Sequence, residues 1–430
     1  MEHQDVVVLI GFLLLFSLVS RRLSTTPISG PMVYVAFGVL IGPSGLGLIH
    51  LDLSDEMVKR VAEITLVLVL FADASRIDLR VLLRERGLPI RLLFVALPLT
   101  IAAGFAVGRW LYPQENWWDV ALVAAILAPT DAALGQAVVS NPGVPMRIRQ
   151  ALNVESGLND GLCVPIIAMF TACAVARHSG AEALISSIGW MGAAAETLGY
   201  GIAVGVVVGI GGVILTGAAC RAGWMSTGWH KLSIFGGPIM MFALAETIGG
   251  SGFIAAFIGG LTVGNATHGM DKEQLFGFTE GAADLLGLFT WAFFGMLFVV
   301  PAIEQATVRA VVLAVACLTF VRMVPTALAL LGMGFGRDTL AFVGWFGPRG
   351  LASIVFAITL LQNPDVLRSE AIFLVVTWAI LLSIVAHGLS AVPGATWYGK
   401  RCKALADAPE LAAAKSYPMH HHAERHGADS

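Results

Sequence analysis

The chain has 430 residues, of which 57% are hydrophobic and only 13% are charged, and its formal net charge is -3. Soluble globular domains carry about 25% charged residues, so a water-facing surface over the whole molecule is excluded. The composition instead predicts an all-α, polytopic membrane protein in a lipid bilayer. No basic patch interleaved with aromatic residues occurs, which argues against nucleic acid as a partner.

Apolar segments of the length of membrane helices follow one another along most of the chain. A span needs about 20 predominantly apolar residues, and about 13 segments come close to that length or exceed it. They cover roughly 5–20, 27–49, 58–75, 88–111, 118–140, 148–176, 191–219, 231–249, 251–265, 280–301, 308–332, 338–362 and 370–395. Glu2 and Asp5 precede the first segment, where a signal peptide would carry positive charge, so we expect a retained membrane helix there.

The distribution of Lys and Arg predicts how the chain is oriented. Cytoplasmic loops carry an excess of these residues, and here the excess lies in every second loop, from Arg21 and Arg22 to Lys400 and Arg401. This predicts an N-terminus outside the cell, a cytoplasmic C-terminus and a multi-pass protein of a prokaryotic cell (inner) membrane. Residues 1–399 form the predicted transmembrane domain, and the polar, Ala-rich residues 400–430 form a cytoplasmic tail.

Ionisable residues inside membrane spans are energetically costly and mark functional sites by default. The densest polar group in the predicted spans combines residues 128–131 with residues 153–161. Ionisable residues within the spans include Asp73, Asp131, Glu155, Asp160, Glu246, Asp284, Arg322, Arg349 and His387. The chemistry of the protein is therefore expected around the two dense segments.

The 153–161 segment presents a defined polar face if it is helical. At about 100° per residue, Asn153, Ser156 and Asp160 lie on one face. Glu155 points about 140° away from Asp160 and must meet a different neighbour. One face thus offers oxygen ligands and a single acid.

Two predicted spans contain residues that break helices. Pro129 lies in the middle of the fifth span, and Gly347-Pro348 lie in the twelfth. Proline removes a backbone donor and crowds the preceding turn, so both helices are expected to be discontinuous. The twelfth span comes seven places after the fifth, and this odd offset makes the two helices run in opposite directions, as inverted-topology repeats with two crossed discontinuous helices require. Broken helices that line a cavity form the ion sites of many secondary transporters.

A carboxylate that holds either a proton or a cation, but not both, gives obligatory exchange of the two ions. Na⁺, Li⁺ and K⁺ all prefer oxygen ligands, so the residues alone leave the choice of cation open. The ligands predicted for the cation are Asp160, Ser156, the Thr130 carbonyl, Asp131 and Asp73. The function expected from the residues is antiport of a monovalent cation and a proton.

These motifs resemble those of the cation:proton antiporter superfamily, in the branch of bacterial NhaP-type and animal NHE-type sodium/proton exchangers. The resemblance covers about residues 5–395 and includes the predicted layout of spans. It rests on Thr130-Asp131, Glu155-Ser156-x-x-Asn159-Asp160, Arg322, Gly347-Pro348-Arg349-Gly350 and Phe71-Ala72-Asp73. The combination is specific, whereas any one of these dipeptides would be a weak signal.

The resemblance implies roles for several of these residues and an NhaA-like fold. Asp160 would alternately bind Na⁺ (or Li⁺) and H⁺, and Asn159 would hydrogen-bond Asp131 where the broken helices cross. Asp73 stands at an acidic position where family members often carry Glu. An Asn-Asp pair at 159–160 is similar to the electroneutral branch, which exchanges one cation per proton.

The resemblance also implies a structural ion pair and an assembly. Glu155 would pair with Arg322 or Arg349, of which Arg322 is favoured. Core helices would cover about 88–176 and 308–395, and dimerisation helices about 5–75 and 191–301. The protein would form homodimers whose core domain moves like an elevator, and it would need no cofactor besides the transported ions.

Three other functions compete with Na⁺/H⁺ antiport. A K⁺/H⁺ antiporter of the same fold differs only in cavity size and ligand number, which the residues do not fix. A pH-gated cation channel would favour repeated filter carbonyls around a symmetric pore, and no such repeat occurs. An intramembrane enzyme is disfavoured because no Gly-x-Ser-x-Gly, His-Glu-x-x-His or paired-aspartate protease pattern is present.

Overall fold

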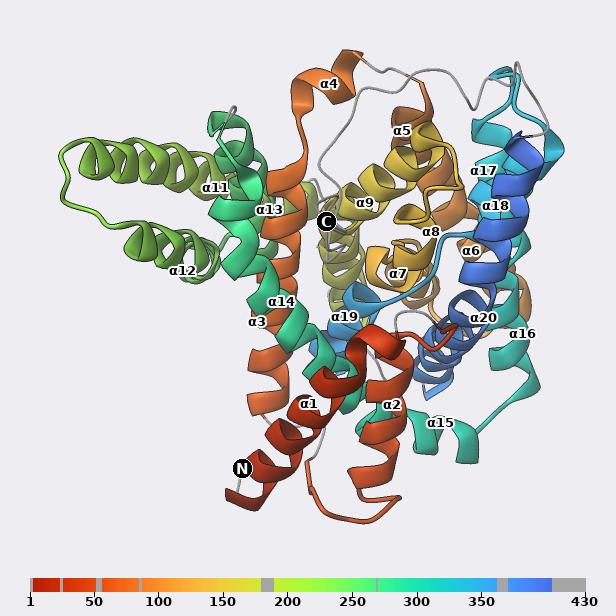
Figure 1. The fold of residues 1–430 in the computed structure, drawn as a ribbon. Coiled ribbons are helices and arrows are strands. Elements are labelled where there is room, and N and C mark those ends of the chain that lie inside the picture. Colours follow the sequence, from red (N-terminus) through yellow and green to blue (C-terminus); the bar gives the residue numbers. More distant parts are fainter. Residues whose placement is uncertain are drawn as a thin grey trace, which may run out of the picture.

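The computed structural model describes residues 3–23, 26–51, 56–84, 87–178, 189–267, 270–361 and 370–403. In these ranges every regular element is a helix (Figure 1). Helices satisfy their backbone hydrogen bonds internally, which a chain in hydrocarbon requires. The predicted all-α fold is confirmed for the described part of the chain. The predicted tail lies outside these residues from position 404 onward, while the last helix reaches Lys403.

Each predicted apolar segment coincides with one helix or with consecutive helices. The elements in chain order are α1 (His3–Leu23), α2 (Gly30–Ile41), α3 (Glu56–Arg76), α4 (Leu79–Arg84), α5 (Leu88–Arg91), η1 (Leu92–Ala96), α6 (Leu97–Leu111), α7 (Trp117–Ile126), α8 (Ala132–Val139), α9 (Met146–His178), α11 (Gly189–Arg221), α12 (Thr227–Thr247), α13 (Gly252–Ala266), α14 (Lys272–Phe294), η2 (Gly295–Val299), α15 (Val300–Glu304), α16 (Val308–Leu318), α17 (Phe320–Ala329), α18 (Arg337–Trp345), α19 (Leu351–Leu361) and α20 (Glu370–Lys403).

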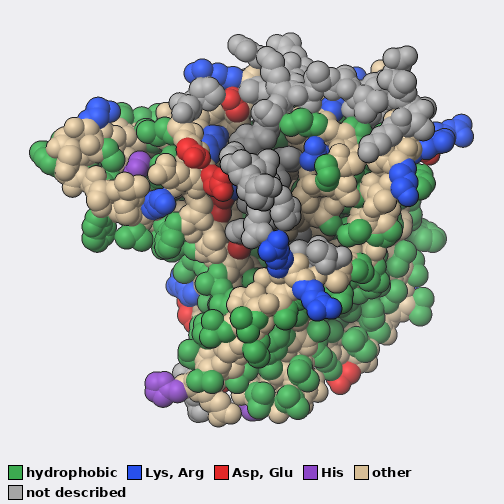
Figure 2. Space-filling model, viewed as in Figure 1, with side chains coloured by type: hydrophobic (Ala, Val, Ile, Leu, Met, Phe, Trp, Pro, Cys, Tyr) green, Lys and Arg blue, Asp and Glu red, His purple; other side chains and the backbone are tan. Residues whose placement is uncertain are grey.

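Length and composition make this a multi-pass membrane protein. Within the described ranges, 7 helical stretches are long and apolar enough to cross a membrane, and shorter apolar helices such as α2, α7, α13 and α19 accompany them. Only 6% of the most apolar window of α1 is buried inside the protein, against 67% for the stretch from Lys272 to Glu304. Hydrophobic side chains cover much of the lower half of the face shown in Figure 2.

The fifth and twelfth predicted spans are both broken, as expected from their prolines. α7 begins at the cap Asn116, whose Oδ1 accepts from the Trp118 amide at 3.0 Å, and it ends at Ile126. Pro129 follows in a non-helical segment before α8 starts. α18 ends at Trp345, and the non-helical 346–350 segment precedes α19. Each break exposes backbone groups that a continuous helix would pair internally.

The helices contact one another mainly within two groups. α3 packs against α13 and α14, and α13 packs against α11 and α12, which extend away from the rest of the molecule in Figure 1. In the second group α7 packs against α6 and α9, α20 packs against α8 and α16, and α17 packs against α6 and α18. Contacts of α3 and α13 with α9 join the groups. The predicted division into core and dimerisation helices remains a prediction.

Candidate functional site

The two helix breaks lie against each other through backbone contacts. The Asp131 amide donates to the Pro348 carbonyl at 2.8 Å. The hydroxyl of Ser353, in the first turn of α19, donates to the Ile126 carbonyl at the end of α7 at 2.7 Å. Residues more than 200 positions apart in the chain are thus held together at one crossing.

Asp131 caps two helices at this crossing. Its Oδ2 accepts from the amide of Leu351 at 2.7 Å, and its Oδ1 accepts from the amide of Leu134 at 3.4 Å. These amides belong to the first turns of α19 and α8. Helix N-termini carry partial positive charge, so one carboxylate stabilises two of them. Asp131 is half-buried and its charge is an integral part of the crossing.

Arg349 complements the opposite ends of the broken helices. It is fully buried, and its Nη1 donates to the Ala128 carbonyl and, at 3.1 Å, to the Pro129 carbonyl. Nη2 donates to the Cys317 carbonyl at 3.3 Å. The carbonyl end of a helix carries partial negative charge, and Arg349 neutralises that end of α7. Among the described residues, the ion pair of Glu155 is with Arg322 and not with Arg349.

A hydrogen-bonded chain from α20 holds the second break. The amide of Arg349 donates to Ser383 Oγ at 2.7 Å, Ser383 Oγ lies 3.1 Å from His387 Nδ1, and His387 Nε2 lies 2.9 Å from the Trp345 carbonyl. A carbonyl only accepts, so Nε2 donates to Trp345, while Nδ1 lies 3.1 Å from both the hydroxyl and the carbonyl oxygen of Ser383. Sequence reasoning did not identify Ser383. Its spacing of four residues from His387 in an apolar helix is the signal that points to it.

Thr130 is held by the polar face of α9. Ser156 Oγ donates to the Thr130 carbonyl at 2.7 Å, and Asn159 Nδ2 donates to Thr130 Oγ1 at 2.7 Å. Asn159 thus bonds Thr130, while the Asp131 carboxylate accepts from the amides of α8 and α19. The bond between Asn159 and Asp131 that the resemblance implies remains a prediction.

Asp160 lies beside this contact with a buried, unpaired oxygen. The residue is 7% exposed, and its Oδ1 has no hydrogen-bond partner among the described residues. The side-chain oxygens of Asn153 and Asn159 share that property. Buried polar atoms in proteins are normally hydrogen-bonded, so three such acceptors on one helix mark a place where a proton, cation or water is needed.

Two further acids, Asp131 and Asp73, lie near Asp160 but do not form a complete set of metal ligands with it. The charges of Asp131 and Asp73 both act on Asp160 electrostatically. Asp73, on α3, lies next to Gly157 of α9: its Cβ is 3.5 Å from the position a Cβ would take there. In the described part of the chain, no three His, Cys, Asp or Glu side chains are grouped closely enough to hold a metal ion. The five ligands predicted for Na⁺ share one region, yet Ser156 and the Thr130 carbonyl bond each other.

Glu155 points away from Asp160 and forms a buried ion pair. Its Oε1 lies 2.6 Å from Arg322 Nη1 of α17, and the two side chains are 3% and 1% exposed. The structure thus places Glu155 against the arginine that the resemblance favours. The pair ties α9 to α17 behind the polar face.

A profile of the family described as "Sodium/hydrogen exchanger, transmembrane" matches residues 8–397. The chain belongs to this family. The match includes both helix breaks, Asp160 and the Glu155–Arg322 pair.

Named relatives cover most of this chain at low identity. The "K(+)/H(+) antiporter NhaP" of Alkalimonas amylolytica is 28% identical over 91% of this chain, and the "K(+)/H(+) antiporter NhaP2" of Shewanella oneidensis is 25% identical over 84%. The chain spans 66% and 61% of the lengths of these two relatives. The "Sodium, potassium, lithium and rubidium/H(+) antiporter" of Bacillus subtilis is 28% identical over 63% of this chain.

A solved structure shares the fold. The sodium proton antiporter MjNhaP1 of Methanocaldococcus jannaschii superimposes with a TM-score of 0.72 at 20% identity, covering 89% of this chain and 99% of that one. This agrees with the expected NhaA-like antiporter fold. The names of these proteins describe their own ions.

Gly350 is required by the close approach of Asp131, and this gives a first prediction. A Cβ atom at Gly350 would overlap the Asp131 carboxylate. Gly350→Ala should displace that carboxylate from the Leu351 amide and remove a helix cap, a loss of about 1 kcal/mol. We expect a lower melting temperature in detergent and slower exchange in proteoliposomes.

Gly277→Ala on α14 is the matched control for this variant. A Cβ there meets nothing within 4 Å, and Ala favours a helix over Gly. The control should melt at or above the wild-type temperature and exchange normally. Equal melting temperatures for the two variants would contradict the requirement for glycine at position 350.

Proposed function

We propose that the protein is a secondary active antiporter that exchanges Na⁺, and also Li⁺, for H⁺. The observation that carries this proposal is Asp160, a buried carboxylate with an unpaired oxygen beside the crossing of two broken helices. A carboxylate there accepts a proton or a cation, and either one supplies the partner that Oδ1 lacks. The opposed helix breaks provide polar backbone groups inside the bilayer.

When the cation binds, it would replace the hydrogen bond between Ser156 and Thr130, which the protein forms in the absence of the ion. Ser156 Oγ and the Thr130 carbonyl oxygen are 2.7 Å apart. A cation bound at Asp160 would separate these two atoms and take both oxygens as ligands. Asp131 and Asp73 add negative charge around Asp160, which favours cation entry. When Asp160 is protonated this attraction falls, and the Ser156–Thr130 bond re-forms.

Asp160 is the one carboxylate that we propose alternates between cation and proton, which supports a stoichiometry of one cation per proton. The neighbouring position is Asn159, whose neutral amide adds no second proton-binding group. Glu155 is occupied by Arg322. A cycle that carries either one cation or one proton on Asp160 moves no net charge, so exchange would be electroneutral.

The second candidate cation is K⁺. Two relatives that cover most of this chain are named K⁺/H⁺ antiporters, and the Bacillus subtilis relative is named for four alkali cations. The oxygen ligands proposed here suit each of these ions. Ion choice would follow from how far Ser156 and Thr130 separate around the bound cation.

Alternating access would come from motion of one helix group against the other. We assign α5–α9 and α16–α20 to a moving core, and α1–α3 and α11–α15 to a homodimer scaffold. The exposure of α11 supports the scaffold assignment. Only 17% of its most apolar segment is buried within one chain, which leaves an apolar face available for a second copy. We place the protein in the inner membrane with its N-terminus outside, as the Lys and Arg distribution indicates.

Transport in proteoliposomes tests the proposed exchange. Vesicles with a trapped pH dye receive gradients of Na⁺, Li⁺, K⁺ or choline, and membrane voltage is clamped with valinomycin or, in the K⁺ arm, with a permeant anion. We expect Na⁺ and Li⁺ to drive proton movement that is insensitive to the clamp. A response to K⁺ alone would select the second candidate. If none of the cation gradients drives proton movement, the antiport proposal is overturned.

A further inference from the structure

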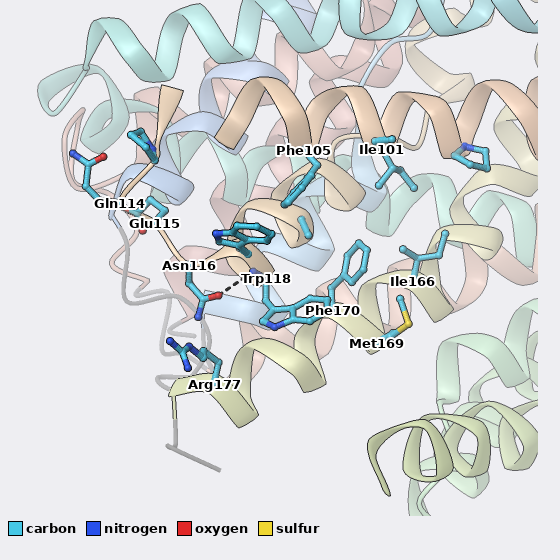
Figure 3. A pocket seen from close by; sticks show the side chains of 15 residues that line it. Ile101, Phe105, Gln114, Glu115, Asn116, Trp118, Ile166, Met169, Phe170 and Arg177 are labelled. Carbon is cyan, nitrogen blue, oxygen red and sulfur yellow. Dashed lines mark hydrogen bonds between the residues drawn. The ribbon is translucent and has the colours of Figure 1, made fainter. Parts of the chain in front are cut away.

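A large cavity opens at one end of α6, α7 and α9, away from the ion site. Its volume is about 1200 Å³, and none of the residues that line it belongs to the Asp160 region. Ligand pockets commonly measure about 300–1,000 Å³, so this space accommodates a long molecule. Figure 3 shows side chains of α6 facing side chains of α9, with Trp118 of α7 between them.

The cavity is amphipathic along its length. Its deep wall is hydrocarbon and aromatic, formed by Ile101, Phe105, Ile166, Met169 and Phe170. The Trp118 and Phe170 rings contact each other with centroids 6.1 Å apart. The charged residues that line the cavity are Glu115 and Arg177, and Figure 3 shows both at one end. Such walls suit a flexible apolar chain that carries one polar end.

The polar end of the cavity lies at a level expected for lipid headgroups. Trp110 and Trp117 are 78% and 65% exposed there, and tryptophan is enriched where a membrane meets water. α6 ends at Leu111 and α9 at His178, so the chain leaves the apolar region at this level. The apolar part of the cavity therefore runs alongside acyl chains.

The charge around this end is positive. Arg109 donates to the carbonyls of Tyr112 and Glu115 at 3.1 and 2.8 Å, and its guanidinium lies 5.2 Å from the Trp117 ring centre. Arg177 lines the rim, and Glu115 supplies one negative charge. Asp119, in the first turn of α7, is a further acid here, but it is buried and is not among the lining residues. The two guanidinium groups at the rim are therefore the groups that would bind an anionic headgroup.

We propose that this cavity binds one anionic phospholipid, with an acyl chain between α6 and α9 and its headgroup beside Arg109 and Arg177. The bound chain would contact Trp118 on α7, the helix that ends at Ile126, whose carbonyl belongs to the crossing. Occupancy of the cavity would thus stabilise the position of a helix that forms the ion site.

Native mass spectrometry of the purified protein tests the site with phosphatidylglycerol and phosphatidylcholine of identical acyl chains. Wild type should retain one phosphatidylglycerol after detergent exchange and no phosphatidylcholine. Ala102→Phe, which places a ring in the cavity between α6 and α9, should lose it. Ala106→Phe, one turn along α6 and outside the lining, should keep it. Equal retention of both lipids, or unchanged retention by Ala102→Phe, would show annular lipid only and overturn the proposal.

A second variant keeps the test decisive if Ala102→Phe fails to fold. Arg177→Gln removes an exposed charge at the rim and should weaken phosphatidylglycerol binding by about fivefold. Arg221→Gln, at the end of α11 and far from the lining residues in sequence, should bind as wild type does. Equal binding by both arginine variants would overturn the headgroup assignment.

Discussion

Asp160→Asn should abolish cation/proton exchange and leave the protein folded. The amide is nearly the same size as the carboxylate, but it neither takes up a proton nor offers a negative charge to a cation. The exchange rate should fall to that of protein-free vesicles. No described cation is paired with Asp160, so removal of its charge orphans no buried arginine. A buried charge is costly in a membrane, so the variant should melt at or above the wild-type temperature.

Transport and melting must be measured on the same preparations for this result to be decisive. Asp338→Asn is the matched control, since it removes a carboxylate whose Oδ2 lies 2.7 Å from Arg401 Nε at the surface. It should exchange at the wild-type rate. Asp160→Glu keeps the charge and should retain part of the activity with altered cation affinity. Wild-type exchange by Asp160→Asn would remove Asp160 from the mechanism.

The helices and their breaks were predictable because they depend on local chemistry. Apolar length identifies a span, and proline cannot donate a backbone hydrogen bond. Pro129 and Pro348 therefore mark both breaks without any knowledge of tertiary structure. Glu155 was also predictable as a member of an ion pair, because a buried charge needs a partner. Its choice of Arg322 over Arg349 required the family resemblance.

The details of the crossing were not predictable because they depend on how distant elements approach each other. A hydroxyl in an apolar helix usually bonds its own backbone, as Thr359 does with the Val355 carbonyl at 2.9 Å. Ser353 instead reaches the Ile126 carbonyl at 2.7 Å. Nothing in the local sequence separates these two cases. The contacts of Asp131 with two helix N-termini were likewise not predictable, because only the folded arrangement brings those amides near its carboxylate.

The relative strength of the contacts at the site indicates which of them persist and which of them open during the proposed transport cycle. Arg349 and Asp131 each join both broken helices and compensate opposite helix ends. These contacts involve charged groups, whose hydrogen bonds are about twice as strong as neutral ones. The Ser156–Thr130 bond is neutral. The crossing should therefore persist through the cycle, while the neutral bond opens and closes with the ion.

Glu155→Ala should lower the free energy of unfolding by about 3–5 kcal/mol, the cost of breaking a buried ion pair from one side. Among the described residues, Glu155 is the only partner recorded for the Arg322 guanidinium, which is 1% exposed. Its removal leaves a cation in the protein interior without a counter-charge. A thermal melt in detergent, followed by denaturant unfolding in the same micelles, measures the loss.

A double-mutant cycle separates the electrostatic contribution of the Glu155–Arg322 pair from the packing contribution of the two side chains. Glu155→Leu combined with Arg322→Met removes both charges at similar size, and such replacements are often neutral or stabilising. The double variant should recover most of the stability that either single variant loses. Asp338→Ala removes one partner of a similar contact, but Asp338 and Arg401 are 40% and 59% exposed, so it should cost about 0–1 kcal/mol. If Glu155→Ala and Asp338→Ala lower the free energy of unfolding by the same amount, burial does not determine how much the Glu155–Arg322 pair stabilises the protein.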